Sequence, residues 1–144
     1  MEYFIRPIQP EDARQAAVLS EQLGYPIAEQ EIRAHIQQML ESDKEIAWVA
    51  ENKGELLGWI QATKMLRIMS GEFGEITGLV VASHLRGKGI GRMLVSEALL
   101  WSQKENFSRL IVRTNVVREA APAFYTRLGF KERKRQAVLA FELE

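Results

Sequence analysis

Residues 79–92 read LVVASHLRGKGIGR, and this stretch decides the fold. It opens with an apolar run typical of a buried strand, and the residues after it have the periodicity of an amphipathic helix. Three glycines and three cations, Arg86, Lys88 and Arg92, lie where the strand would turn into the helix. Such a turn presents several backbone N–H groups at a helix N-terminus, which attract an anion. The stretch therefore predicts a pyrophosphate-binding turn.

Two other phosphate motifs fit this turn poorly. A P-loop requires Ser or Thr after its Gly-Lys pair, and Gly89 follows Lys88 here. A dinucleotide fingerprint requires a third glycine at the position that Arg92 occupies, and it follows the first strand of its βαβ unit. The turn of this chain follows the fourth expected strand.

Hydrophobic periodicity and turn residues predict strands and helices on both sides of the turn. Gly78, inside the strand before the turn, indicates a bulge or a close backbone approach, and 67–74 is expected to be a loop. The order β-α-α-β-β-β-α-β-α-β-β predicts one α/β (α+β) domain over residues 1–144, with a mixed sheet that has helices on its faces. The expected strands are Tyr3–Ile8, Glu45–Glu51, Glu55–Lys64, Phe73–Ala82, Leu110–Thr114, Phe130–Arg135 and Ala137–Leu143, and the expected helices are Pro10–Leu23, Ala28–Glu41, a helix from the turn to Glu105, and Glu119–Leu128.

Composition narrows the classes of function. The 19 basic and 19 acidic side chains cancel, which argues against a nucleic-acid-binding module. With no cysteine and only two histidines, the chain offers no disulfide framework, thiolate zinc site or cysteine nucleophile, and we expect no metal. The N-terminus lacks the pattern of a signal peptide, and no apolar run approaches a membrane span. We therefore expect a cytoplasmic protein without a membrane partner.

Two segments resemble the GNAT acetyltransferases. The run R-G-K-G-I-G, residues 86–91, resembles the family's Q/R-x-x-G-x-G/A signature. Residues 120–130, AAPAFYTRLGF, look like its A-x-x-F-Y-x-x-x-G-F segment, and the order of elements matches as well. The resemblance implies the GNAT fold, a mixed, mostly antiparallel twisted sheet of about seven strands flanked by about four helices. It also implies an N-acetyltransferase that uses acetyl-CoA as cosubstrate and acts by direct attack in a ternary complex.

The resemblance also assigns the residues that bind the cosubstrate. Backbone N–H groups of the turn would hold the pyrophosphate, and the end of the preceding strand would pair with the pantetheine arm. An N–H near Leu79 or Val81 would polarise the thioester carbonyl. Ser83 stands where the family usually has proline. The assigned residues are Leu79, Val80, Val81, Arg86, Gly87, Lys88, Gly89, Ile90, Gly91 and Arg92, with Asn115 as a further contact on the pantetheine or adenosine side.

Two catalytic roles follow from the same resemblance. Tyr125 corresponds to the tyrosine that acts as general acid, and a phenol with a pKa of ~10 can protonate a leaving thiolate with a pKa of ~8.5. Glu75 lies six residues before Val81, where the histone acetyltransferases of the family carry a base. The alternatives are a core role for Tyr125 and a solvated strand position for Glu75, with ordered water as the base. Arg118 stands where the family often has Asn.

The acceptor has no signature in the sequence. An aminoglycoside-like antibiotic, a polyamine, an amino acid and a protein amine are all compatible with it. Tyr25 lies between the first two helices, in a region that lines the acceptor groove of the family, and acids such as Glu21, Glu29 and Glu31 would favour a cationic acceptor. A CoA-binding regulatory domain without turnover and a nucleotide- or phosphate-binding module are the competing functions. Relatives commonly form homodimers, so a homodimer is one arrangement open to this chain.

Overall fold

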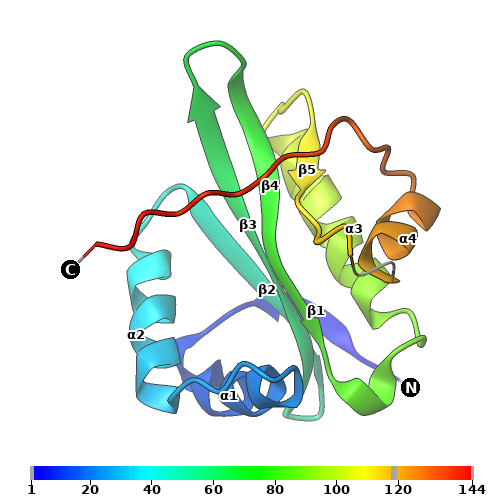
Figure 1. The fold of residues 1–144 in the computed structure, drawn as a ribbon. Coiled ribbons are helices and arrows are strands. Elements are labelled where there is room, and N and C mark those ends of the chain that lie inside the picture. The colour runs from blue at the N-terminus through cyan, green and yellow to red at the C-terminus, as the bar shows by residue number, and fades with distance from the viewer. Residues whose placement is uncertain (1, 118–119, 144) are drawn as a thin grey trace. The chain divides into compact units, whose positions relative to one another are not determined.

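The protein is built on a five-stranded sheet in the order β1-β2-β3-β4-β5 (Figure 1). The computed structural model describes residues 2–117 and 120–143. All neighbouring strands are antiparallel except β4 and β5, which are parallel. The mixed, mostly antiparallel sheet confirms the predicted fold class. The strands are β1 (Phe4–Pro7), β2 (Glu45–Asn52), β3 (Glu55–Arg67), β4 (Gly71–Val81) and β5 (Leu110–Val112).

Helices lie on both faces of this sheet (Figure 1). Side chains alternate between the faces of a strand, and this alternation decides which residues meet which helix. The ring of Trp48 in β2 packs edge-on against the ring of Trp101 in α3, with 6.2 Å between the ring centres. The buried residues on either side of Trp48, Ala47 and Val49, face the opposite side of the sheet. The helices are α1 (Ala13–Gln22), α2 (Glu29–Leu40), α3 (Ile90–Lys104) and α4 (Ala120–Arg127), with short 3-10 turns η1 (Pro10–Asp12) and η2 (Ser83–Leu85).

The chain divides into two compact units, Met1–Arg113 and Thr114–Glu144. The first contains the sheet and α1 to α3, and the second contains α4 and the C-terminal segment. Gly129, with φ 101°, takes the left-handed conformation that the sequence predicted after α4. The predicted start of this helix, Glu119, lies outside the described residues. That all 144 residues form one domain stays a prediction.

The predicted loop at 67–74 is wrong. β3 continues to Arg67 and β4 begins at Gly71, so the two strands form a long hairpin. Lys64 and Glu72 form an ion pair at 2.8 Å, and the guanidinium of Arg67 lies 5.9 Å from the centre of the Phe73 ring. These cross-strand contacts stabilise a strand end whose own residues have weak β-propensity.

The predicted count of seven strands is also wrong. Phe130–Arg135 and Ala137–Leu143 have strand-like patterns, but the described part of the chain places neither of them in a ladder. Residues 131–143 run as an irregular, exposed segment, drawn in orange to red in Figure 1. A strand requires a neighbouring backbone, and side-chain alternation alone does not say whether one is present.

Candidate functional site

The glycine-rich turn takes a conformation that only its glycines allow. Gly87 and Gly89 have φ values of 79° and 87°, which L side chains rarely adopt. Gly89 is the N-cap of α3 and provides no side-chain cap. The Met93 amide donates to the Gly89 carbonyl at 3.1 Å. The amides of residues 90–92 consequently have no acceptor within the helix. They form a cluster of donors at the positive end of the helix dipole.

Cations surround this cluster. Arg86, Lys88 and Arg92 are exposed, and no ion pair to any of them is found within residues 2–117 and 120–143. They add positive charge to the donors without neutralising partners. The predicted phosphate cradle therefore has both the free amides and the charge that an anion requires.

The turn is anchored on both sides. Leu85 and Ile90 are buried, 5% and 1% exposed, so both ends of the exposed segment between them are fixed to the core. The side-chain oxygen of Gln22, at the end of α1, accepts a hydrogen bond of 3.0 Å from the Ser83 amide. This bond ties the end of α1 to the loop that leads into the turn. No local pattern predicts this bond, because Gln22 and Ser83 lie 61 positions apart in the chain.

The strand that leads to the turn has one open edge. β4 pairs with β5 only from Gly74 opposite Leu110 to Ile76 opposite Val112. Beyond Ile76, the described residues place no strand against that edge, while the other edge stays paired with β3 as far as Val81. The last part of β4 is thus a half-paired strand.

A β-bulge determines which backbone groups face the open edge. Gln61 pairs with Gly78 and Ala62 pairs with Ile76, so Thr77 is the additional residue of β4. The sequence predicted that Gly78 would permit the bulge. Gly78, however, has no left-handed φ and has open space around its Cβ position, so its lack of a side chain is not what the bulge requires.

Beyond the bulge, two amides face outward. The Ala82 amide donates to the Leu57 carbonyl at 2.8 Å, which continues the ladder towards β3. Since N–H groups alternate between the two edges of a strand, the amide of Val80 faces β3 and the amides of Leu79 and Val81 face the open edge. These are the donors that the sequence analysis assigned to the thioester carbonyl.

Gly58 of β3 permits a close approach of the two strands at this point. A Cβ on Gly58 would lie 2.5 Å from the Val80 carbonyl oxygen and 3.2 Å from the Val81 Cα. Any larger residue would push the end of β4 away. Gly58 was not among the predicted site residues, although a glycine inside a strand pattern is a signal of close backbone approach.

Glu75 is buried and ion-paired. It is 9% exposed, and the Nε of Arg113 donates to its Oε2 at 3.2 Å. Gly74 faces α3, since its Cβ position lies 3.1 Å from the Trp101 ring, so Glu75 points to the other face of the sheet. The alternative of a solvated strand residue is therefore wrong, and Arg113 was not predicted as the partner of Glu75.

Tyr125 and Asn115 belong to the second unit. Tyr125 is 7% exposed, and its ring packs edge-on against Phe124 at 5.0 Å and Phe130 at 5.3 Å. This burial raises the pKa of Tyr125 to about 12. Asn115 is exposed, and its Oδ1 accepts a hydrogen bond of 3.1 Å from the Val117 amide. Arg118 lies outside the described residues.

The structure therefore brings together most, but not all, of the predicted site. One continuous backbone holds Glu75, the outward amides of β4 and the whole turn, within the first unit. The alignment of Tyr125 and Asn115 with that backbone stays a prediction. Within residues 2–117 and 120–143, no group of histidines and acids is arranged to hold a metal ion. No helix among the same residues is long and apolar enough to cross a membrane.

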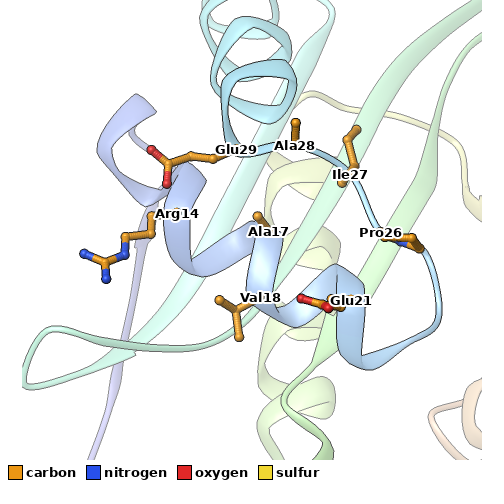
Figure 2. Close-up of a pocket in the computed structure, with 8 residues that line it drawn as sticks. All are labelled: Arg14, Ala17, Val18, Glu21, Pro26, Ile27, Ala28 and Glu29. Carbon is orange, nitrogen blue, oxygen red and sulfur yellow. The ribbon is translucent and has the colours of Figure 1, made fainter.

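A hollow of about 470 Å³ lies between α1 and the segment that enters α2 (Figure 2). Its walls combine small apolar side chains with two carboxylates and one guanidinium. Tyr25 does not line it and is 62% exposed. The lining residues are Arg14, Ala17, Val18 and Glu21 on α1, and Pro26, Ile27, Ala28 and Glu29 on the following segment.

Comparison with known proteins gives consistent matches. The model of the acetyltransferase (GNAT) family matches residues 11–130. The N-acetyltransferase family 8 member 3 of Rattus norvegicus is 30% identical over 86 residues, which cover 59% of this chain and 38% of that protein. The chain thus spans about two fifths of the length of this curated relative.

Solved structures share the fold at low sequence identity. The aminoglycoside N-acetyltransferase AAC(6')-Iy in complex with CoA has a TM-score of 0.87 at 17% identity, over 99% of this chain and 96% of that one. The glucosamine-6-phosphate N-acetyltransferase from Arabidopsis thaliana has a TM-score of 0.83 at 19% identity, over 99% of this chain and 100% of that one.

Proposed function

Because this chain belongs to the acetyltransferase (GNAT) family, we propose that it transfers an acetyl group from acetyl-CoA to a primary amine. The observation that carries the proposal is the continuity of the open edge of β4 with the turn. The open edge offers outward amides to an extended, amide-containing arm. The turn offers unpaired amides to a diphosphate. Coenzyme A has these two parts in this order.

The residues of the first unit would bind and polarise the cosubstrate. The amides of residues 90–92, together with the charges of Arg86, Lys88 and Arg92, would hold the pyrophosphate. The amide of Leu79 or Val81 would donate to the thioester oxygen, where negative charge develops. These donors belong to a strand paired with β3 and to a turn whose ends, Leu85 and Ile90, are buried, so they need little rearrangement when the charge appears.

The reaction requires a neutral amine and an acid for the leaving group. The amine nitrogen bonds to the acetyl carbon as the carbon–sulfur bond breaks, and the thiolate takes a proton. Tyr125 is the proposed donor, since a hydroxyl with a pKa of about 12 stays protonated through the physiological range. Direct transfer fits a chain that has no cysteine to carry the acetyl group.

Glu75 is the proposed base, directly or through water. It lies on β4, six residues before Val81, and its face of the sheet is opposite to α3. Its Oε2 accepts from Arg113, and no hydrogen bond to its Oε1 is found among residues 2–117 and 120–143. A carboxylate in this position can accept the proton that the amine must lose.

We propose that the acceptor enters the hollow beside α1 and carries positive charge. Glu21 and Glu29 place carboxylates on its walls, and an ammonium group is their natural partner. The Gln22–Ser83 hydrogen bond keeps this end of α1 close to the loop before the turn. An acceptor in the hollow would thus lie on the side of the molecule where β4 ends.

A cytoplasmic location and a homodimer also stay predictions.

Calorimetry and a transfer assay test the function together. Acetyl-CoA should bind in a one-to-one ratio, while ATP and NAD bind at least tenfold more weakly, and a panel of polyamines, aminoglycosides and basic peptides should release CoA with at least one member. Absence of acetyl-CoA binding would contradict the proposal. If acetyl-CoA binds but CoA is released neither by acetyl transfer to any acceptor nor by slow hydrolysis, the regulatory CoA-binding domain is favoured instead.

A further inference from the structure

Two guanidinium groups lie against one buried aromatic ring near the end of the β3–β4 hairpin. Phe73 of β4 is 4% exposed, and the guanidinium carbons of Arg109 and Arg67 lie 4.4 Å and 5.9 Å from its ring centre. Arg67 ends β3 and Arg109 immediately precedes β5, so the two cations approach the ring from the strands on either side of β4. The hairpin end extends away from α1 and α2 (Figure 1). Two positive charges are thus held beside a single side chain.

Neither of these cations has a counter-ion. Among the residues that the structure describes, no ion pair to Arg67 or Arg109 is found. Glu72 and Glu75, the acids on this part of β4, form ion pairs with other cations. Contact with the ring offsets part of the repulsion between the two guanidiniums, but it does not neutralise their charge.

Arg109 also has a buried nitrogen without a hydrogen-bond partner. Its Nε is the one buried side-chain nitrogen or oxygen atom of the described residues that makes no hydrogen bond. The backbone at this point is nevertheless fixed, because the Gly74 amide donates to the Arg109 carbonyl at 3.1 Å. A stacked and unpaired guanidinium presents its outer N–H groups as a preformed fork, which matches the oxygens of a phosphate or carboxylate. An unsatisfied buried group of this kind is accounted for if a bound anion compensates the charge.

The pair of arginines lies far from the glycine-rich turn. Phe73 precedes Val81 by eight residues, or roughly 26 Å along an extended strand. An anion bound here is therefore separate from a pyrophosphate at the amides of residues 90–92. Because Gly74 faces α3, its neighbours Phe73 and Glu75 both face the other side of the sheet. The arginines thus share a face with the proposed base, which lies roughly 7 Å further along the strand.

We propose that Arg67 and Arg109 form a second anion site, which takes a phosphate group. A phosphate carries close to two negative charges at neutral pH and matches two unpaired cations, whereas a carboxylate matches only one. Free phosphate and the phosphate monoester of a small amine both supply this chemistry. A monoester bound here directs its amine along β4 towards Glu75.

NMR of the Arg109 side chain tests the site on the full chain. Its buried Nε–H should exchange slowly with water, and inorganic phosphate, titrated at constant ionic strength, should shift its signal along a saturating curve. Arg67→Gln removes the other cation from an exposed position and should weaken this binding about tenfold or more, because a charge-assisted hydrogen bond is lost. Arg86→Gln, the matched control, removes the same charge at the glycine-rich turn and should change the binding less than threefold.

Three results would overturn the proposal. They are a shift that does not saturate, an equal shift with acetate at the same ionic strength, and phosphate binding that is unchanged in Arg67→Gln. In each case the two guanidiniums serve only to cover the ring of Phe73.

Phosphoethanolamine and ethanolamine distinguish the two sources of the phosphate. If phosphoethanolamine binds at least threefold more tightly than inorganic phosphate and also shifts the amides of Thr63 and Glu75, the ligand is an amine that carries a phosphate. If it binds no more tightly and the shifts stay around Phe73, the ligand is free phosphate. A saturating shift of the Arg109 signal with ethanolamine, which has no phosphate, would contradict both. These measurements require no turnover, so their outcome does not depend on acetyl transfer.

Discussion

Gly58 and Val80 are in such close contact that a Cβ on Gly58 would lie 2.5 Å from the Val80 carbonyl oxygen. Gly58→Ala must therefore displace the end of β4, since the obstacle is backbone. We expect a loss of about 2 kcal/mol in unfolding free energy, measured by urea denaturation. We also expect at least tenfold weaker acetyl-CoA binding, measured by calorimetry, because the outward amides of Leu79 and Val81 move with the strand.

Gly78→Ala is the matched control for this prediction. Gly78 lies on the neighbouring strand, next to the bulge, with no left-handed φ and no atom within 4 Å of its Cβ position. We expect its unfolding free energy to change by less than about 0.5 kcal/mol. Equal losses in the two variants would mean that the close approach at Gly58 is not the cause.

The two glycines that flank Ile90 should respond in opposite ways. Gly89 has φ 87°, so Gly89→Ala should cost about 1–2 kcal/mol of stability. Gly91 is inside α3 without a left-handed φ, so Gly91→Ala should raise the stability of the ligand-free protein by up to about 1 kcal/mol. Both variants should bind acetyl-CoA more weakly, one through strain and the other because a methyl group crowds the donors. Thermal melts with and without acetyl-CoA measure both effects.

The fold was predictable wherever a local pattern determines a local structure. The strand, turn and helix around residues 79–92 follow from hydrophobic periodicity and from glycines at positive φ. The β3–β4 hairpin beyond Lys64 was not predictable, because contacts such as the Lys64–Glu72 ion pair exist only once the strands are paired. The prediction of strands at Phe130–Arg135 and Ala137–Leu143 was wrong for a related reason. Their sequence pattern is strand-like, but a strand forms only where another backbone segment is present to pair with it.

Tyr125 should affect both catalysis and alkaline stability. Tyr125→Phe keeps the ring but removes the proposed acid, so kcat should fall about a hundredfold or more with little change in acetyl-CoA affinity. Burial raises the pKa of Tyr125 to about 12, against ~10 in the unfolded chain. Between these values the unfolded chain loses its proton first, so stability falls as pH rises from about 10 to 12, by up to about 3 kcal/mol.

Denaturation of both proteins at pH 9 and pH 11.5 measures this linkage. The wild type should lose more stability between the two pH values than Tyr125→Phe, which has no phenol to ionise. If the variant keeps wild-type kcat while the alkaline difference is present, Tyr125 is a buried core residue and not the acid.

Glu75 requires a test that separates proton transfer from structure. Glu75→Gln removes the proposed base but keeps the shape of the side chain, so kcat, measured by release of CoA, should fall about a hundredfold. Arg113→Gln removes the partner at 3.2 Å and keeps the carboxylate, so kcat should fall much less. If the two variants lose kcat equally and lose the same unfolding free energy in urea, the pair is structural.

The site was predictable in its backbone and less so in its side chains. Donors at residues 90–92 follow from a helix that starts after Gly89. The outward direction of the Leu79 and Val81 amides depends on the extra residue Thr77, which only the β3–β4 register reveals. The contacts from Gln22 to Ser83 and from Arg113 to Glu75 join residues 61 and 38 positions apart, beyond any local pattern.

The charge of the hollow beside α1 should determine the acceptor. Glu21→Gln removes a carboxylate from its wall, so KM for a cationic acceptor should rise about three- to tenfold, an effect of the size that a partly exposed ion pair provides. The KM for acetyl-CoA should stay the same.

Glu31→Gln is the matched control. Glu31 lies on α2 outside the lining, so this variant removes the same charge from the protein and should change neither the KM for the acceptor nor the KM for acetyl-CoA. Added salt should narrow the difference between Glu21→Gln and wild type, because screening weakens the attraction that only the wild type retains. Equal effects of the two variants would mean that the overall charge of the protein causes the preference for a cationic acceptor. If neither variant changes KM, the acceptor does not bind in this hollow.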